Sequence, residues 1–85
     1  ETVEDTLPYI EKIEEALTHM GEAIHKNIRK VDVCTRYSAM QYLIILSQPT
    51  EAEIPNIMTR IFMQYYKLQD SQNFTPTYEY ITMKD

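Results

Sequence analysis

The chain has a single glycine, Gly21, among its 85 residues. Tight β-hairpins and sandwich turns need residues at positive φ, and glycine adopts such angles at the least cost. One glycine cannot supply many of these turns. The near-absence of glycine therefore argues against an all-β fold.

Cysteine and long apolar runs are equally scarce. Cys34 is the only cysteine, so the chain can form no internal disulfide, which predicts an intracellular location, in the cytoplasm or the nucleus. The sequence contains no run of 18 apolar residues and no signal peptide, so we expect no membrane span. Because it begins with Glu1, we interpret the chain as a piece of a longer protein or a processed form.

Basic residues are outnumbered, since 13 acidic and 8 basic side chains give a net charge of −5. An acidic chain is repelled by phosphate backbones, which makes nucleic acid an unfavourable partner. The charge is uneven, however, and the region between residues 25 and 36 carries four basic residues against Asp32 alone. This local basic patch consists of Lys26, Arg29, Lys30 and Arg36.

Apolar residues recur every three or four positions through the first third of the chain. They are Leu7, Ile10, Ile13, Leu17, Met20, Ile24, Ile28 and Val31. This spacing predicts one amphipathic helix over residues 6–30, roughly 37 Å long. Gly21 lies at the border of the stripe and indicates either the close approach of a neighbouring helix or a break in this one.

Two further helices are predicted in the middle of the chain. Asp32 is the expected N-cap of a helix over 33–47, which ends before Pro49. A capping box formed by Thr50 and Glu53 indicates a short turn over 50–54, followed by a main helix over 55–69. The core stripe expected for this last helix is Ile54, Ile57, Met58, Ile61, Tyr65 and Leu68.

The end of the chain has a different pattern, because residues 77–83 alternate as in a β-strand. We expect either a tail or an edge strand that pairs with another chain. The predicted fold is therefore all-α. A helical bundle over residues 1–70 has three helices, or four if the turn at 50–54 is counted, and residues 71–85 form an extended C-terminal tail.

Seven tyrosines and five methionines, without any tryptophan, give the strongest hint of function. Methionine adapts to irregular surfaces and tyrosine provides rigid contact area with a polar tip, so both are common at interfaces. We predict partner-binding residues in a groove between the second and third helices, and on a part of the first helix that extends beyond them. The predicted partner-binding residues are Leu17, Ile24, Tyr37, Met40, Phe62, Met63 and Tyr66. A Met-rich core is the competing interpretation.

Signs of catalysis, cofactors or metals are weak. His19, Glu22 and His25 follow a spacing used in di-iron bundles, but the motif occurs once and its histidines diverge around the helix, so solvated side chains explain it better. No serine lies in a nucleophile motif, and no glycine-rich loop could bind phosphate. We expect no enzyme activity, no cofactor and no metal. Tyr80 and Met83 match a short phosphotyrosine motif, for which an unmodified tail is the better interpretation.

One partial resemblance to a known family involves about a quarter of the chain, residues 24–46. Its Ile-x-Lys-Asn and Asp-Val-Cys segments, followed by Ala39, Leu43 and Leu46, resemble helical adaptor domains of transcription elongation factors. Those domains have an additional helix that this sequence lacks, and no residue role is transferred from them.

The expected function is a non-catalytic module for protein–protein interaction or oligomerisation within a larger protein. Its partner would be a second copy of the chain, or a helical or extended peptide of another protein. The alternative is a helical domain that contacts nucleic acid, or a transcription adaptor, through the basic patch.

Overall fold

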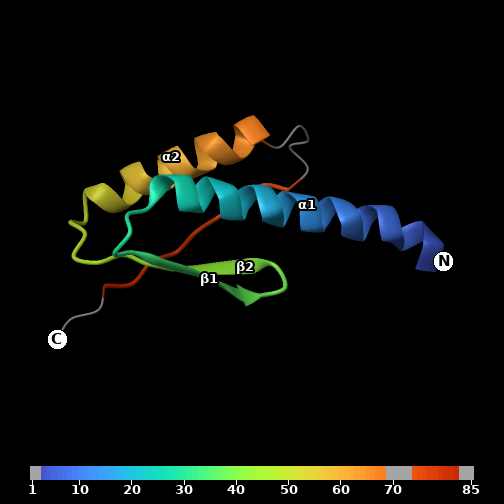
Figure 1. Cartoon of the computed structure of the whole chain (residues 1–85), viewed down its shortest axis with the longest axis horizontal. Helices are drawn as coiled ribbons and strands as arrows, with labels where there is room; N and C mark the ends of the chain where they lie inside the picture. The colour runs from blue at the N-terminus through green and yellow to red at the C-terminus, as the bar shows by residue number, and fades with distance from the viewer. Residues whose placement is uncertain (1–2, 69–73, 83–85) are drawn as a thin grey trace.

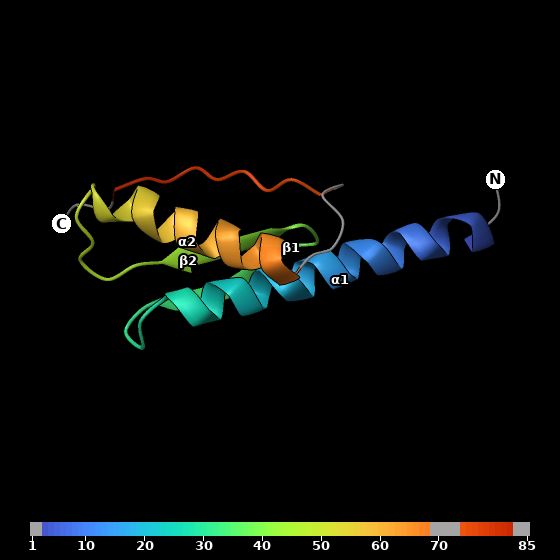
Figure 2. The same cartoon turned by 90° about the horizontal axis from the view of Figure 1, so that it is seen from above.

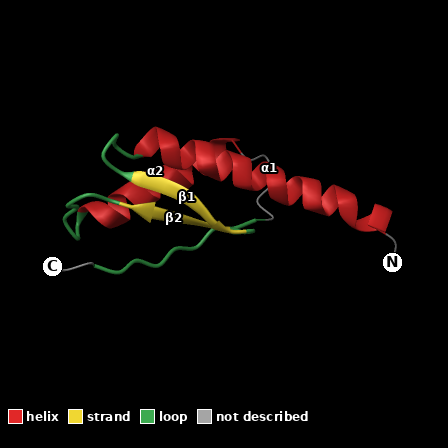
Figure 3. Cartoon of the chain, turned by 60° about the horizontal axis from the view of Figure 1, so that its bottom comes forward, coloured by secondary structure: helices red, strands yellow, loops and turns green. Residues whose placement is uncertain are grey.

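The computed structural model describes residues 3–68 and 74–82, which form two helices and a β-hairpin (Figure 1). In chain order they are α1 (Val3–Asn27), β1 (Val33–Ser38), β2 (Gln41–Ile45) and α2 (Glu53–Leu68). The helices lie side by side and antiparallel, and the hairpin lies along one side of the pair (Figures 1 and 3). The fold is therefore mixed α and β, and the prediction of an all-α bundle of three or four helices is wrong.

The first helix, predicted over residues 6–30, spans Val3–Asn27, and it is continuous, which the sequence left open. It passes through Gly21 without a break. The reason for a glycine here is Tyr42 of β2, because a Cβ on Gly21 would lie 2.8 Å from the Tyr42 hydroxyl oxygen. That hydroxyl donates a 2.7 Å hydrogen bond to the carbonyl oxygen of Leu17. A strand residue, not a neighbouring helix, makes the close approach.

The segment predicted as a helix over 33–47 forms the antiparallel hairpin instead. Val33 lies opposite Ile45, and Thr35 lies opposite Leu43. Residues with β-branched or aromatic side chains are frequent in both strands and fit a pleated sheet better than a helix. The apolar run over 43–46, interpreted from sequence as a buried helical turn, has alternate side chains on the two faces of the sheet.

The turn at the hairpin tip explains how one glycine suffices. Gln48 is the only non-glycine residue at positive φ among the described residues, so neither residue of the tip, Ala39 or Met40, needs glycine's freedom. Arg36 donates hydrogen bonds to the carbonyl oxygens of Ser38 and Ala39. The Ser38 hydroxyl donates to the side-chain oxygen of Gln41 at 2.8 Å. Side-chain hydrogen bonds thus stabilise a turn that no sequence pattern predicts.

The last helix agrees closely with the sequence pattern. Thr50 accepts a 3.3 Å hydrogen bond at its hydroxyl from the backbone N–H of Glu53, where α2 begins. Pro55 lies in the first turn, where a missing N–H costs no helical hydrogen bond. Three members of the predicted stripe, Ile57, Ile61 and Tyr65, are buried.

The core lies between the two helices. Ala16 and Ala23 of α1 are small enough to allow α2 to come close, and Ile24 packs beside Ile57 and Ile61. Half-buried side chains of the hairpin cover this cluster on one side. They are Cys34, Tyr42, Ile44 and Leu46. The hairpin is thereby held on a helical layer, which a two-stranded sheet requires for stability.

The C-terminal segment, residues 74–82, is extended and runs from beside α1 back towards the end of the hairpin at which β1 begins (Figures 1 and 3). Phe74 anchors its start, because its carbonyl oxygen accepts a 2.8 Å hydrogen bond from the Tyr65 hydroxyl. The ring of Phe74 also packs against Tyr9, at 5.9 Å between ring centroids. Residues 77–82 of the predicted strand are extended but form no strand with the hairpin, and Met83 lies outside the described residues.

The molecule is elongated, with extents of 50 × 26 × 20 Å. The first half of α1 projects beyond α2 and the hairpin (Figures 1 and 2). Neither of the two described helices combines the length and the apolar character needed to cross a lipid bilayer.

Candidate interaction surface

The outward side of the hairpin exposes a group of apolar side chains, here called the hairpin surface. Four of its members have between 43% and 64% of their area exposed, and the two near the tip have more than 60%. The residues are Val31, Val33, Leu43 and Ile45, with Tyr37 and Met40 at the tip. The register places Val33 beside Ile45 on one face. Adjacent exposed aliphatic side chains of this kind are unusual on a monomer and are typical of contact surfaces.

Charge is nearly absent from this surface. Arg36 is the only charged residue from Val33 to Ile45. Its guanidinium lies 5.6 Å from the centre of the Tyr42 ring and binds the carbonyl oxygens of the tip. Depletion of charge around exposed apolar groups is characteristic of the centre of protein interfaces.

A polar network fixes the base of the hairpin to the end of α1. The carboxylate of Asp32 accepts hydrogen bonds from the backbone N–H groups of Arg29, at 2.8 Å, and Ser47, at 2.9 Å. The Arg29 guanidinium forms a salt bridge with the same carboxylate at 3.1 Å and donates to the Ser47 carbonyl oxygen. Asp32 therefore joins the loop after α1 to both ends of the hairpin, and its predicted role as a helix N-cap is wrong.

The environment of Asp32 favours its charged form. The pKa of Asp32 is lowered from 3.8 to about 2, mainly by the hydrogen bond from the Arg29 side chain. The hydrogen bonds from the backbone N–H groups of Ser47 and Arg29 lower this pKa further. Burial acts in the opposite direction and is outweighed. The same pairing raises the pKa of Arg29. This ion pair thus remains intact at neutral pH.

A second exposed surface combines α2 with the C-terminal segment. The ring of Phe62 meets Tyr78 edge-on at 5.9 Å between centroids, and Tyr66 packs against Tyr65 at 5.3 Å. Met63 and Tyr66 are exposed, whereas Phe62 is half-buried. The groove predicted between the second and third helices has no counterpart, because the second helix is a hairpin, and α2 instead faces the extended segment.

The structure separates the sequence-predicted partner residues into three places. Tyr37 and Met40 belong to the hairpin surface, and Met63 and Tyr66 are exposed on α2 beside half-buried Phe62. Leu17 and Ile24 are buried inside this chain, so they are part of its core and of no exposed surface. Val33, Leu43 and Ile45 are not among the partner-binding residues predicted from the sequence, because a helical interpretation of this segment hides the period-two pattern that groups them.

The basic patch is divided by its own hydrogen bonds. Arg29 binds Asp32, and Arg36 binds the carbonyl oxygens at the hairpin tip. Lys26 and Lys30 are exposed near the end of α1. Two of the four basic side chains are thus engaged in holding the fold.

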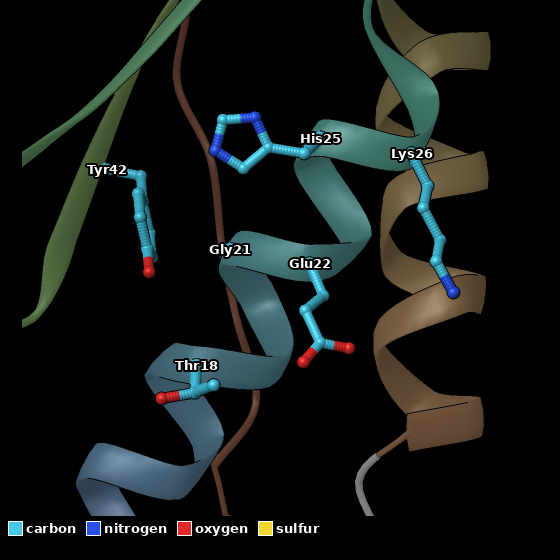
Figure 4. A pocket seen from close by; sticks show the side chains of 6 residues that line it. All are labelled: Thr18, Gly21, Glu22, His25, Lys26 and Tyr42. Atoms are coloured by element: carbon cyan, nitrogen blue, oxygen red, sulfur yellow. The ribbon is translucent and has the colours of Figure 1, made fainter.

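An open depression lies between α1 and the hairpin (Figure 4). Tyr42 reaches into it from β2, and the remaining lining residues come from one stretch of α1 (Figure 4). They are Thr18, Gly21, Glu22, His25 and Lys26.

Within the described part of the chain, no three metal-ligating side chains come together. Burial raises the pKa of the Cys34 thiol, which therefore stays protonated at neutral pH.

Comparisons with protein-family models, curated proteins and solved structures gave no match to this chain. The partial resemblance of residues 24–46 to helical adaptor domains is also inconsistent with the structure, because much of this stretch forms the hairpin.

Proposed function

We propose that this chain is a non-catalytic protein–protein interaction module that self-associates through the hairpin surface. The observation that supports this function is the exposure of six apolar side chains within fifteen residues, Val31 to Ile45, on a hairpin with one charged residue. Burying apolar area is the main favourable term in association. Because the surface itself has almost no charge, contact between two copies there adds little local repulsion to that of their net charges.

Protein is a better partner for this chain than nucleic acid or a membrane. The net charge of −5 opposes contact with phosphate, and two of the four residues of the basic patch bind acceptors within the fold. The module is proposed to work inside the cell, in the cytoplasm or the nucleus. Its single cysteine and the absence of any possible internal disulfide support a reducing compartment.

The test is the solution molar mass of the full chain, measured by size-exclusion chromatography with light scattering from low to high micromolar concentration. We expect the mass to rise from monomer to dimer. Leu43→Lys places a charge at the centre of the hairpin surface and should keep the chain monomeric, because an unpaired charge in an apolar contact is strongly unfavourable.

Thr59→Lys is the matched control, since it adds the same charge at an exposed position of α2, away from the hairpin. This variant should dimerise as the unmodified chain does. Both variants should keep the same circular dichroism and melting temperature, because both positions are outside the core. A monomeric unmodified chain at every concentration would contradict self-association.

A further inference from the structure

The first half of α1 is largely uncovered. It continues past the tip of the hairpin and past α2 (Figures 1 and 2). Of the described side chains of α1, none before Ala16 is buried, whereas four between Ala16 and Ile24 are buried. The ring of Tyr9 packs against Phe74. The exposed part of the helix is residues 8–15, here called the projecting segment.

One side of the projecting segment continues the helical surface on which the hairpin packs. Ile10 lies about two turns before Leu17 and about three turns before Gly21, so the three share one side of α1. Tyr42 holds the hairpin on that side through the Leu17 carbonyl oxygen and the space above Gly21. The hairpin does not extend as far as Ile10, which has 49% of its area exposed. An apolar helical surface is thus left without a hairpin.

The projecting segment is acidic, whereas the base of the hairpin is basic. Three exposed carboxylates of the segment outnumber its one ammonium group; they are Glu11, Glu14 and Glu15, against Lys12. Lys26 and Lys30 are exposed where α1 ends, and neither forms an ion pair with a described residue. Lys30 directly precedes Val31, the first residue of the hairpin surface. The two ends of one molecule therefore carry opposite charges.

These charges distinguish between the ways in which two copies can meet. Two projecting segments laid against each other would bring acidic groups together. Two hairpin surfaces stacked on each other would leave Ile10 exposed. A projecting segment laid across the hairpin surface of a second copy covers both apolar surfaces and brings opposite charges together. That attraction offsets part of the repulsion between two chains that each carry a net charge of −5.

We propose that two copies of the chain form a dimer in which the projecting segment of each lies across the hairpin surface of the other. This inference rests on the proposed self-association and specifies which part of the second copy covers the hairpin. The two α1 helices are then antiparallel, and the acidic start of each lies near the basic end of the other. A two-fold axis repeats the contact, so the assembly closes at two copies.

The test reverses the charges at each end of the full chain. Glu11→Lys with Glu14→Lys makes the projecting segment basic and changes the net charge from −5 to −1, because each replacement adds two units. The lower net charge by itself would strengthen association. We nevertheless expect the dimer dissociation constant to rise about tenfold or more at low ionic strength, because like charges now meet in both copies of the contact.

Exchange of the charges within one chain is the matched control. Lys26→Glu with Lys30→Glu should also weaken the dimer. A quadruple variant that carries all four replacements keeps the net charge of −5 and restores opposite charges between unlike ends. Its dissociation constant should return to within about threefold of that of the unmodified chain. Light scattering measures the mass of each chain, and circular dichroism should show equal helix content because all four positions are exposed.

The outcomes separate the two proposals. A monomeric unmodified chain overturns self-association itself. A dimer that Glu11→Lys with Glu14→Lys leaves unchanged or strengthens keeps self-association standing and overturns the contact between helix and hairpin. A quadruple variant as weak as its two parent variants overturns that contact as well, because pairing between like ends gains nothing from an exchange of charges within one chain.

Discussion

At the scale of single residues, Gly21 and Tyr42 form a closely fitted contact. The tyrosine ring crosses α1 where the helix has no Cβ, and its hydroxyl reaches the Leu17 carbonyl. Glycine inside a helix costs about 1 kcal/mol relative to alanine. The hydrogen bond and the close approach of β2 offset that cost.

Gly21→Ala should therefore lower the free energy of unfolding by about 1 kcal/mol, because the displaced hydroxyl loses its hydrogen bond and the ring must shift. A Tyr42→Phe background lacks the hydroxyl oxygen, which is the atom nearest to the new Cβ. There, Gly21→Ala should raise the free energy of unfolding by up to about 1 kcal/mol through helix propensity. Urea denaturation of the four chains in this cycle measures the change. Equal effects in both backgrounds would show that the contact is not the reason for the glycine.

Asp32 gives the second prediction for a single residue. In the folded chain the pKa of Asp32 is about 2, below its ordinary value of 3.8. The ionised carboxylate therefore contributes its full stabilisation at a pH above 3.8, and this contribution is lost as the pH falls from 3.8 towards 2. Asp32→Asn should remove this part of the pH dependence. The difference between the two chains should be on the order of 1–2 kcal/mol at neutral pH, allowing for solvent screening at the exposed Arg29.

Denaturant titrations of both chains from pH 7 to pH 2 test the prediction for Asp32. Because other carboxylates titrate in both chains, the measured quantity is the difference between the two curves. A difference that stays constant down to pH 2 would contradict the role of the ionised carboxylate at the hairpin base.

At the scale of elements, the two helices and the hairpin differ in how clearly the sequence predicts them. The stripes over α1 and α2 have the helical period, and both helices form close to the expected residues. The hairpin was missed because Val33, Tyr37, Met40 and Ile44 also fit a helical period. Its turn has no glycine, and the hydrogen bonds of Arg36 and Ser38 that stabilise it appear only in three dimensions.

The two faces of α2 should respond differently to truncation. Ile61 has no exposed area and contacts the centre of the core, so Ile61→Val should lower the free energy of unfolding by about 0.5–1.5 kcal/mol. Met63 lies on the same helix with its side chain exposed. Met63→Ala should therefore change the free energy of unfolding by less than about 0.5 kcal/mol. Chemical denaturation measures both. A large loss for Met63→Ala would place that residue in a packed environment.

At the scale of the whole molecule, the sequence indicates the components better than their arrangement. The long first helix, its projection beyond the other elements, and the extended end of the chain are all visible in the pattern of residues. What the pattern does not show is which side chains meet. Leu17 and Ile24 belong to a stripe that α2 covers, and only the folded chain shows that they are buried and that Val33, Leu43 and Ile45 are exposed.

The position of Cys34 gives the molecule a built-in kinetic probe. The only thiol of the chain is on the inward side of β1, half-buried among side chains that join the hairpin to the helices. The half-buried thiol is partly accessible in the folded chain and becomes fully accessible when the hairpin lifts from the helical layer. A variant that loosens the hairpin base, such as Asp32→Asn, should therefore raise the rate at which a thiol reagent modifies Cys34, without global unfolding and without any introduced label.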